Sequence, residues 1–173
     1  MSGMKRNHLS QLRVACGFAL ILLIAMGSVL LVAVHGADTD MYPHGFRQWV
    51  HVKSAMLTSA HPAAQAEGGL HHIYANRKAF DGYASGNFPD GAVVVYELLE
   101  TNEKDAVISE GARRRLDVMM KDSGRYAATG GWGFARFMGS NDTANVLDAT
   151  AAASCFECHG RASGHGYIFS RIR

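Results

Sequence analysis

The sequence predicts an α+β fold rich in β-structure, in which five to six strands form an antiparallel sheet accompanied by two or three short helices. Short segments of alternating apolar and polar residues recur along the chain, separated by Gly, Pro and Asn. Helical spacing is confined to a few short stretches. A chain of 173 residues fits one domain of ordinary size.

The expected strands follow one another along most of the chain. The clearest is 92–99, because it carries three consecutive β-branched valines. Residues 102–111 are polar and are expected to form a loop after it. Further strands are predicted at 50–54, 70–74, 113–121, 132–137 and 167–169.

Two helices are expected. Residues 76–83 have helical spacing, and Asn76 is a suitable N-cap. Phe88-Pro89-Asp90-Gly91 then predicts a turn, because proline fixes φ and Asp-Gly tolerates the return of the chain. A second short helix over 148–154 leads into a pair of cysteines.

Cys155-Phe156-Glu157-Cys158-His159 is the stretch with the most specific chemistry. Two cysteines two residues apart, followed directly by histidine, are typical of c-type haem attachment. The spacing lets both thiols reach the haem vinyl groups, while the next residue brings its imidazole to the iron. The sequence therefore predicts one covalent haem c, held by Cys155 and Cys158, with His159 as the proximal iron ligand.

A disulfide, a redox-active pair and half of a zinc site are the alternatives for these cysteines. A redox motif usually opens a helix after a strand, and 149–154 precede the pair instead. Zinc would need further ligands, and the sequence has no second cysteine pair. Covalent haem attachment remains the favoured interpretation.

Residues 1–36 have the layout of an export segment. Lys5, Arg6 and Arg13 precede or flank an uncharged apolar run over 14–34. This run suits either a cleaved signal peptide or an N-terminal membrane anchor. Either would place 37–173 in the periplasm as a single domain, in contact with the membrane only through an uncleaved leader.

The charge of the exported part excludes nucleic acid as a partner class. Residues 1–36 contain three of the 17 basic residues and none of the 15 acidic ones. The remaining 14 basic and 15 acidic residues give residues 37–173 a formal charge of −1. A domain with this balance lacks the basic surface that nucleic-acid binding requires.

A series of motifs in fixed order indicates a family. The motifs are Tyr42-Pro43, Phe46-Arg47-Gln48-Trp49, His72-Ile73-Tyr74-Ala75-Asn76, Phe88-Pro89-Asp90-Gly91, Met119-Met120-Lys121-Asp122, Gly130-Gly131-Trp132-Gly133-Phe134, Cys155–His159 and the expected strand Tyr167-Ile168-Phe169. In this combination the chain resembles the cytochrome P-460 family, which also contains the cytochromes c′-beta. The likeness covers nearly all of 42–173.

The resemblance implies a β-rich mono-haem periplasmic fold, usually a homodimer, with an open iron face opposite His159. Cytochrome P-460 proper oxidises hydroxylamine, with nitric oxide as co-reactant, towards nitrous oxide. An enzyme of this kind would pass electrons to a soluble c-type cytochrome. The c′-beta members instead bind nitric oxide in an apolar distal pocket. A simple electron-transfer cytochrome is a third alternative and would need a sixth ligand such as methionine.

The resemblance also suggests two functional residues beyond the haem motif. In cytochrome P-460 proper a lysine is cross-linked to the haem edge, and Lys78 lies at a comparable place before the Phe-Pro turn. The alternative is a solvated helix lysine. The enzymatic members use a distal carboxylate as general base. Glu97, on the same strand face as Val93 and Val95, is the candidate, and an exposed edge glutamate is its alternative.

Other side chains are candidates for contacts around the haem. Arg47 is expected to meet a propionate or a distal ligand, or else to form a surface ion pair. Phe80 and Phe88 are candidate haem contacts or ordinary core residues. Three histidines and, as a weaker candidate, Met138 offer a sixth ligand, although an open distal face is favoured; the histidines are His71, His72 and His165. Residues 113–115, three consecutive arginines, are expected to be a solvated strand entry, with a docking patch for an acidic partner as the alternative.

Overall fold

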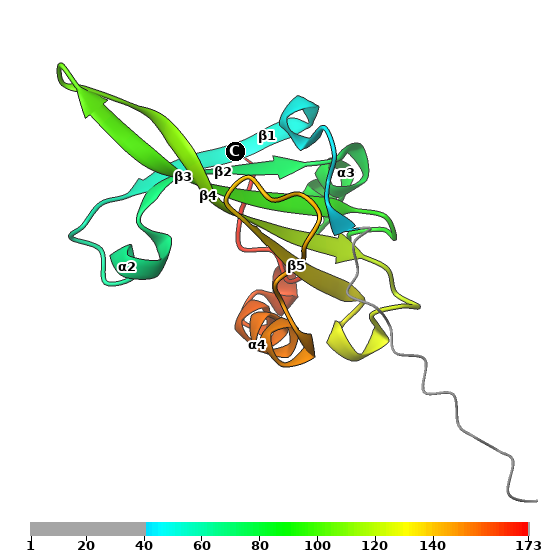
Figure 1. Cartoon of the computed structure of the whole chain (residues 1–173). Coiled ribbons are helices and arrows are strands. Elements are labelled where there is room, and N and C mark those ends of the chain that lie inside the picture. The colour runs from blue at the N-terminus through cyan, green and yellow to red at the C-terminus, as the bar shows by residue number, and fades with distance from the viewer. Residues whose placement is uncertain (1–40, 173) are drawn as a thin grey trace, which may run out of the picture. The chain divides into compact units, whose positions relative to one another are not determined.

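The computed structural model describes residues 41–172, and its central feature is one five-stranded antiparallel sheet. The strands follow the chain order β1-β2-β3-β4-β5, so each pairs with its sequence neighbour (Figure 1). This confirms the predicted antiparallel sheet. The strands are β1 (Val50–Leu57), β2 (Gly69–Ala75), β3 (Val93–Lys104), β4 (Val107–Lys121) and β5 (Trp132–Met138).

Three short α-helices accompany the sheet, as predicted. α3 is the helix expected after Asn76, whose side chain accepts a hydrogen bond from Ala79 N at 2.9 Å. It ends where Gly86 adopts a left-handed conformation. The helices are α2 (Ala64–Glu67), α3 (Arg77–Ser85) and α4 (Ala149–Gly160), with 3₁₀ turns η2 (Phe46–Gln48), η3 (Ala127–Thr129) and η4 (Ser163–His165).

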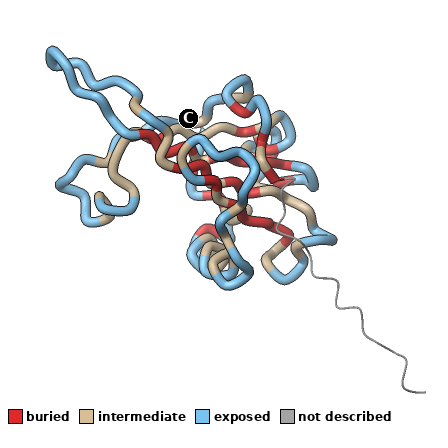
Figure 2. The backbone as a smooth tube through the Cα atoms, in the orientation of Figure 1, coloured by how far each residue is buried: buried red, intermediate tan, exposed pale blue. Residues whose placement is uncertain are grey.

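The sheet separates two apolar clusters, because successive side chains of a strand point to opposite faces. One face packs Val93 and Val95 of β3 with Phe137 of β5 and with Phe46. The other face packs Val94, Met119, Phe134 and Trp132 against residues of α3, α4 and the C-terminal segment. Figure 2 shows the buried residues concentrated along the middle of the strands. The face covered by α4 carries the candidate site.

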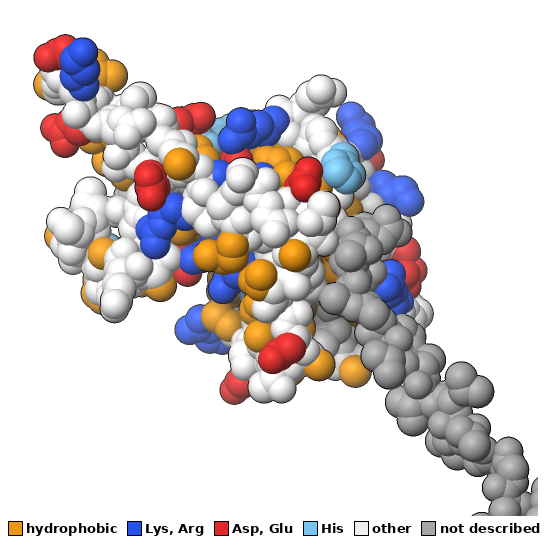
Figure 3. Space-filling view, in the orientation of Figure 1, with side chains coloured by type: hydrophobic (Ala, Val, Ile, Leu, Met, Phe, Trp, Pro, Cys, Tyr) orange, Lys and Arg blue, Asp and Glu red, His pale blue; other side chains and the backbone are white. Residues whose placement is uncertain are grey.

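β3 and β4 continue well beyond the rest of the sheet as a two-stranded hairpin (Figure 1). Asp105 and Ala106 both have positive φ, which gives the two-residue turn that suits the twist of a hairpin. The prediction of a loop over 102–111 was therefore wrong. Its polar composition reflects strands with solvent on both sides, and Figure 3 shows charged and apolar side chains together at the tip.

The C-terminal segment is not the strand that was predicted for 167–169. Tyr167 has a φ of 68°, in the left-handed region that strand residues do not adopt. Its backbone N–H donates to Ala162 O at 3.0 Å instead of to a neighbouring strand. The segment therefore folds back on the end of α4.

The expected export segment at 1–36 lies outside the described residues. Among residues 41–172, no helix is long and apolar enough to cross a membrane.

Candidate functional site

α4 brings Cys155, Cys158 and His159 onto one helix face, because residues spaced by three and four positions are neighbours on a helix. The helix begins after Asp148, whose carboxylate accepts a hydrogen bond from Ala151 N at 2.8 Å. It was predicted to end at 154 but continues through the motif to Gly160. Both cysteines are free thiols. Two thiols and one imidazole are thus presented together.

His159 has a defined tautomer. Its Nδ1 lies 2.7 Å from the backbone carbonyl oxygen of Tyr167. A carbonyl only accepts, so Nδ1 carries the proton and Nε2 keeps its lone pair. The ring also lies between Phe134 and Phe169, with centroid distances of 5.5 and 5.0 Å. Burial lowers the pKa of His159, which further favours the neutral ring.

A cavity of about 510 Å³ opens beside these three residues, and all three line it. Its other wall is the sheet. Strand pairing aligns Lys53, Ile73, Tyr96, Asp117 and Arg136 in one row across all five strands, and every member of this row lines the cavity.

A second, apolar row lies beside the first. Val94 of β3, Met119 of β4 and Phe134 of β5 are cross-strand partners, and all three line the cavity. Ile168 adds an apolar wall from the C-terminal segment. The cavity therefore has an apolar part next to a polar part.

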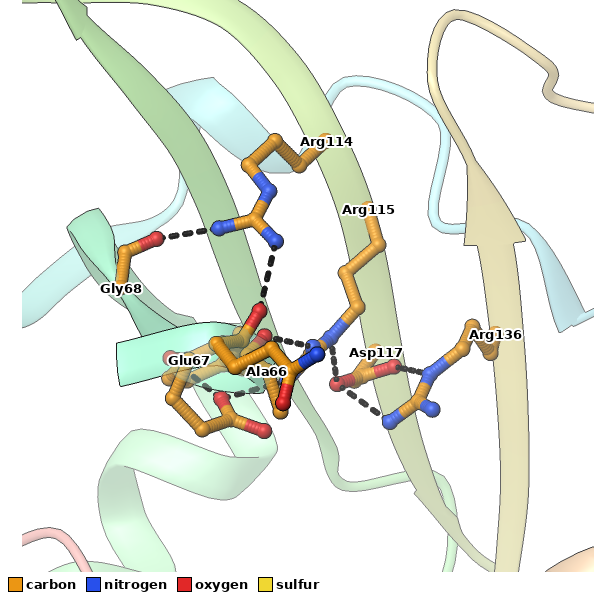
Figure 4. A network of polar contacts seen from close by, with 9 residues as sticks. Ala66, Glu67, Gly68, Arg114, Arg115, Asp117 and Arg136 are labelled. Carbon is orange, nitrogen blue, oxygen red and sulfur yellow. Dashed lines mark hydrogen bonds and ion pairs between the residues drawn. The ribbon is translucent and has the colours of Figure 1, made fainter. Parts of the chain in front are cut away.

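The polar part of the wall is a network of ion pairs (Figure 4). Arg115 donates to Glu67 Oε2 at 2.5 Å and to Asp117 Oδ2 at 2.9 Å. Arg136 donates to both carboxylate oxygens of Asp117, at 2.5 and 3.0 Å. Burial raises the pKa of Glu67, but the hydrogen bond and charge of Arg115, together with the hydrogen bond from Tyr96, outweigh it, and the pKa lies below its ordinary value.

Tyr96 and His71 complete this wall. The phenol of Tyr96 donates to Glu67 Oε2 at 3.0 Å. Burial, followed by the nearby Glu67 carboxylate, raises the pKa of Tyr96, so the phenol keeps its proton. The imidazole of His71 stacks on the Tyr96 ring, with centroids 4.8 Å apart and planes 28° apart.

The model of the cytochrome P460 family matches residues 43–170. The chain belongs to the cytochrome P460 family. No curated protein matches the chain. The predicted family resemblance is thereby confirmed, and the family supports a haem protein of nitrogen-oxide metabolism.

The residues present fit the haem that the cytochrome name implies. The cavity has an apolar part to hold a macrocycle, and His159 turns an unprotonated Nε2 away from the Tyr167 carbonyl. Its hydrogen bond to a backbone carbonyl is the outer contact that usually orients a histidine ligand. Cys155 and Cys158 lie on the wall of the same cavity.

Lys78, the predicted cross-linking residue, lies away from this cavity wall. It is exposed on α3, and its Nζ donates to the backbone oxygen of Asp90 at 3.0 Å. The side chain thus lies against the Pro89–Gly91 turn, where a Cβ on Gly91 would come within 2.7 Å of Nζ. This placement favours the alternative of an ordinary helix lysine.

Arg47 and Glu97 come together, but on the sheet face opposite the cavity. Glu97 is 1% exposed, and Arg47 donates to its two carboxylate oxygens at 2.6 and 3.3 Å. The expectation that Glu97 shares a face with Val93 and Val95 is met, and its buried carboxylate is paired. Because β3 alternates, it is Tyr96 that faces the cavity. This pair is therefore badly placed for contact with a haem or its distal ligand.

The candidate aromatic residues differ in what they contact. Phe88 packs on Trp132 and Tyr83, at centroid distances of 5.6 and 5.3 Å, and belongs to the core beside the cavity. Phe80 is a partly buried residue against the same core. The aromatic residues that contact His159 are Phe134 and Phe169.

The expectation of a solvated arginine entry at 113–115 was wrong for Arg115. It is 9% exposed and binds two carboxylates. The signal that was available in the sequence is the alternation of β4, which puts Arg115, Asp117 and Met119 on one face. A charged pair on the face of a half-buried strand indicates a polar site, since isolated buried charges are unfavourable.

Proposed function

We propose that this protein is a mono-haem c-type cytochrome of the P460 family that acts on small nitrogen oxides. The observation that carries the proposal is the hydrogen bond from His159 Nδ1–H to the Tyr167 carbonyl, because it leaves Nε2 free at a cavity lined by Cys155 and Cys158. These residues would supply one axial ligand and two thioether attachments for a single haem c.

When bound, the haem iron would supply one-electron chemistry and a coordination position for the ligand. The chain itself holds His159 in one tautomer and excludes water with the apolar row of Val94, Met119 and Phe134. The polar row places Tyr96 and Asp117 beside this apolar row, on the same sheet wall of the cavity. We propose an open distal face: of the candidate sixth ligands, His72, His165 and Met138 do not line this cavity, and His71 lines it from β2 on the sheet wall.

We propose hydroxylamine oxidation, with nitric oxide as co-reactant towards nitrous oxide, as the reaction. Such a reaction removes protons from the substrate and needs polar groups near it. The carboxylates that line the cavity are Asp117 and Glu67 rather than Glu97. Because Arg115 and Arg136 donate to both of its oxygens, Asp117 acts here as a fixed negative charge held between two guanidinium groups.

Binding or scavenging of nitric oxide, as in the c′-beta members, is the second candidate function. The apolar part of the cavity favours it, because a small diatomic ligand needs no hydrogen-bonding partner there. The ion-paired polar wall favours the hydroxylamine reaction instead, because an apolar gas would not require it. Simple electron transfer is less well supported.

We also propose a periplasmic location and a homodimer, on the basis of the export layout of residues 1–36 and the family. A soluble c-type cytochrome would be the electron acceptor of the enzymatic form. The protein would contact the membrane only if its leader stays uncleaved.

The test is production of the full chain in a bacterial host with c-type cytochrome maturation. We expect an intact mass increased by one haem and a haem absorption spectrum of a five-coordinate iron. Substituting Cys155→Ala together with Cys158→Ala should abolish the covalent mass increase, whereas Ser154→Ala, on the same helix, should not. Absence of haem from the exported wild-type protein would refute the proposal. A haem-containing protein that does not turn over hydroxylamine would leave nitric-oxide binding as the function.

A further inference from the structure

His71 is a buried histidine on the cavity wall that the attachment motif does not use. It lies on β2, is 9% exposed, and lines the same cavity as His159. Strand alternation sends its neighbour His72 to the other face. There His72 bonds to Ser54 Oγ and Glu110 Oε1, at 2.6 and 2.8 Å. The two adjacent histidines therefore differ in what they contact.

His71 has hydrogen-bonding capacity that the protein does not use. Its Nδ1 is buried, and within residues 41–172 it has no hydrogen-bond partner. A buried polar atom without a partner costs free energy, and nearly all such atoms in folded proteins are satisfied. This unpaired nitrogen, on the wall of a cavity large enough for a ligand, indicates a partner that enters the cavity.

The neighbouring polar groups of the wall are already engaged. Glu67 accepts from Tyr96 and Arg115, and Asp117 accepts from Arg115 and Arg136. Lys53, at the other end of the row, is exposed to solvent. His71 is thus the buried member of this wall with a ring nitrogen still available.

The ring of His71 is also held in place. It stacks on Tyr96 at 4.8 Å, and the Tyr96 phenol is fixed by its bond to Glu67. The Arg115 guanidinium lies 5.6 Å from the centroid of the same phenol ring. The His71 ring thus stacks on a phenol that is itself fixed, and a ring held in this way is preorganised for a ligand.

Burial and the nearby Lys53 charge lower the pKa of His71, so the ring is neutral near pH 7. A neutral imidazole offers one N–H donor and one acceptor nitrogen. It suits a small neutral ligand that both donates and accepts hydrogen bonds. Hydroxylamine has this character and carbon monoxide does not.

We propose that His71 is the specificity-determining residue of the cavity, which hydrogen-bonds to a small hydrogen-bonding nitrogen compound and favours it over apolar diatomic gases. The proposal rests on the proposed function, since the ligand is held in the haem cavity. Beyond that function, it names the residue that selects the ligand, and it names the chemical class of that ligand.

The test compares the haem-loaded wild type with His71→Phe, which keeps a ring against Tyr96 but removes both nitrogens, and with His71→Gln, which keeps a donor and an acceptor. His72→Phe is the matched control on the opposite face. The affinities for hydroxylamine and for carbon monoxide are measured from the change in haem absorption after rapid mixing. The C–O stretching frequency of the carbonyl form and the thermal unfolding midpoint of the ligand-free protein are also measured.

We expect His71→Phe to weaken hydroxylamine binding about tenfold, the effect of one lost hydrogen bond, with carbon monoxide affinity nearly unchanged. The C–O stretch should shift to higher frequency in His71→Phe, and His71→Gln should retain much of the wild-type behaviour. The unfolding midpoint of His71→Phe should not fall, because the nitrogen it removes has no partner in the protein.

Unchanged hydroxylamine affinity and an unchanged C–O stretch in His71→Phe, at normal haem content, would overturn the proposal for His71. They would leave the proposed haem function standing. Equally weakened binding of hydroxylamine and carbon monoxide, together with a lower unfolding midpoint, would also overturn it. His71 would then have a structural role only. Absence of covalent haem from the wild type would instead refute the proposed function, on which this inference rests.

Discussion

His159 donates its Nδ1 proton to the carbonyl oxygen of Tyr167 across 2.7 Å, and Tyr167 presents that oxygen from a left-handed backbone conformation. Two successive left-handed residues make this geometry. Gly166, the C-cap of η4, has a φ of 64°, and Tyr167 follows with a φ of 68°. A non-glycine residue in this region is strained, and such strain is found where a function requires it. The strain here serves to orient the imidazole.

Gly166→Ala should therefore disturb the site. The added Cβ would lie 2.6 Å from Gly86 O and from the Phe88 ring, and the residue would be forced into a left-handed conformation. We expect a loss of about 1–3 kcal/mol in the free energy of unfolding, with a lower yield of covalently attached haem. Urea unfolding and intact mass measure the two effects.

Gly139→Ala is the control for this prediction. Gly139 also has positive φ, at 54°, but a Cβ there meets nothing within 4 Å. It should cost about 1 kcal/mol and leave haem attachment as in the wild type. Equal effects of the two substitutions on attachment would contradict the role assigned to the turn before Tyr167.

Arg115→Ala should destabilise the fold through the two carboxylates that it leaves behind. The Arg115 side chain is 11% exposed and binds Glu67 and Asp117, which are themselves partly buried. Removing one partner of such a network is expected to cost about 2–4 kcal/mol, discounted for the partial exposure of the acids. Arg77→Ala, in the exposed pair with Asp81 on α3, should change the unfolding free energy little. Chemical denaturation compares the two variants.

Acid should weaken the same network. The folded-state pKa of Glu67 lies below its ordinary value of 4.5, because Arg115 and Tyr96 outweigh the effect of burial. A carboxylate with a lowered folded pKa contributes stability that is fully present above 4.5 and is lost as the pH falls through the folded value. Unfolding midpoints measured from neutral to acidic pH should therefore fall less steeply in Glu67→Gln than in the wild type. Parallel profiles would show that another acid dominates.

The sequence was most informative where one local pattern decides the structure. Asn76 began a helix because its side chain caps Ala79, and the valines of 92–99 formed a strand because β-branched residues suit it. Cys155, Cys158 and His159 share a helix face by spacing alone. Each of these features depends on residues within one turn or one strand.

The polar row of the cavity was harder to predict because it depends on strand register. Tyr96, Asp117 and Arg136 become neighbours only through the pairing of β3, β4 and β5. Glu97 was the candidate carboxylate because it falls in the segment where the family's distal carboxylate would sit, on the strand face of Val93 and Val95, yet one position along β3 changes the face of the sheet. The hairpin over 102–111 was missed because an exposed strand has no apolar face to reveal it.

The Arg47–Glu97 pair should affect stability and not the haem. Arg47→Ala leaves the buried Glu97 carboxylate without its bidentate partner, on the sheet face away from Cys155. We expect a loss of about 1–3 kcal/mol in unfolding free energy, since the Arg47 side chain is 59% exposed and its charge is screened. The haem absorption spectrum of the folded protein should match that of the wild type. A shifted spectrum would contradict the assignment of this pair to the opposite face.

Lys78→Ala gives the sharpest contrast between the family expectation and the structure. A lysine cross-linked to the haem edge would alter the absorption spectrum, and its removal would restore an ordinary c-type spectrum. In this structure Lys78 Nζ donates to Asp90 O, at the turn beside α3, and the side chain is exposed. We therefore expect the spectra of Lys78→Ala and of the wild type to coincide, with at most a small loss of stability from the missing hydrogen bond. Peptide mapping of the wild type should find the haem on the peptide with Cys155 and Cys158 and an unmodified Lys78. A haem-linked Lys78 peptide, or a spectral change in the variant, would require α3 to move against the cavity when haem is bound.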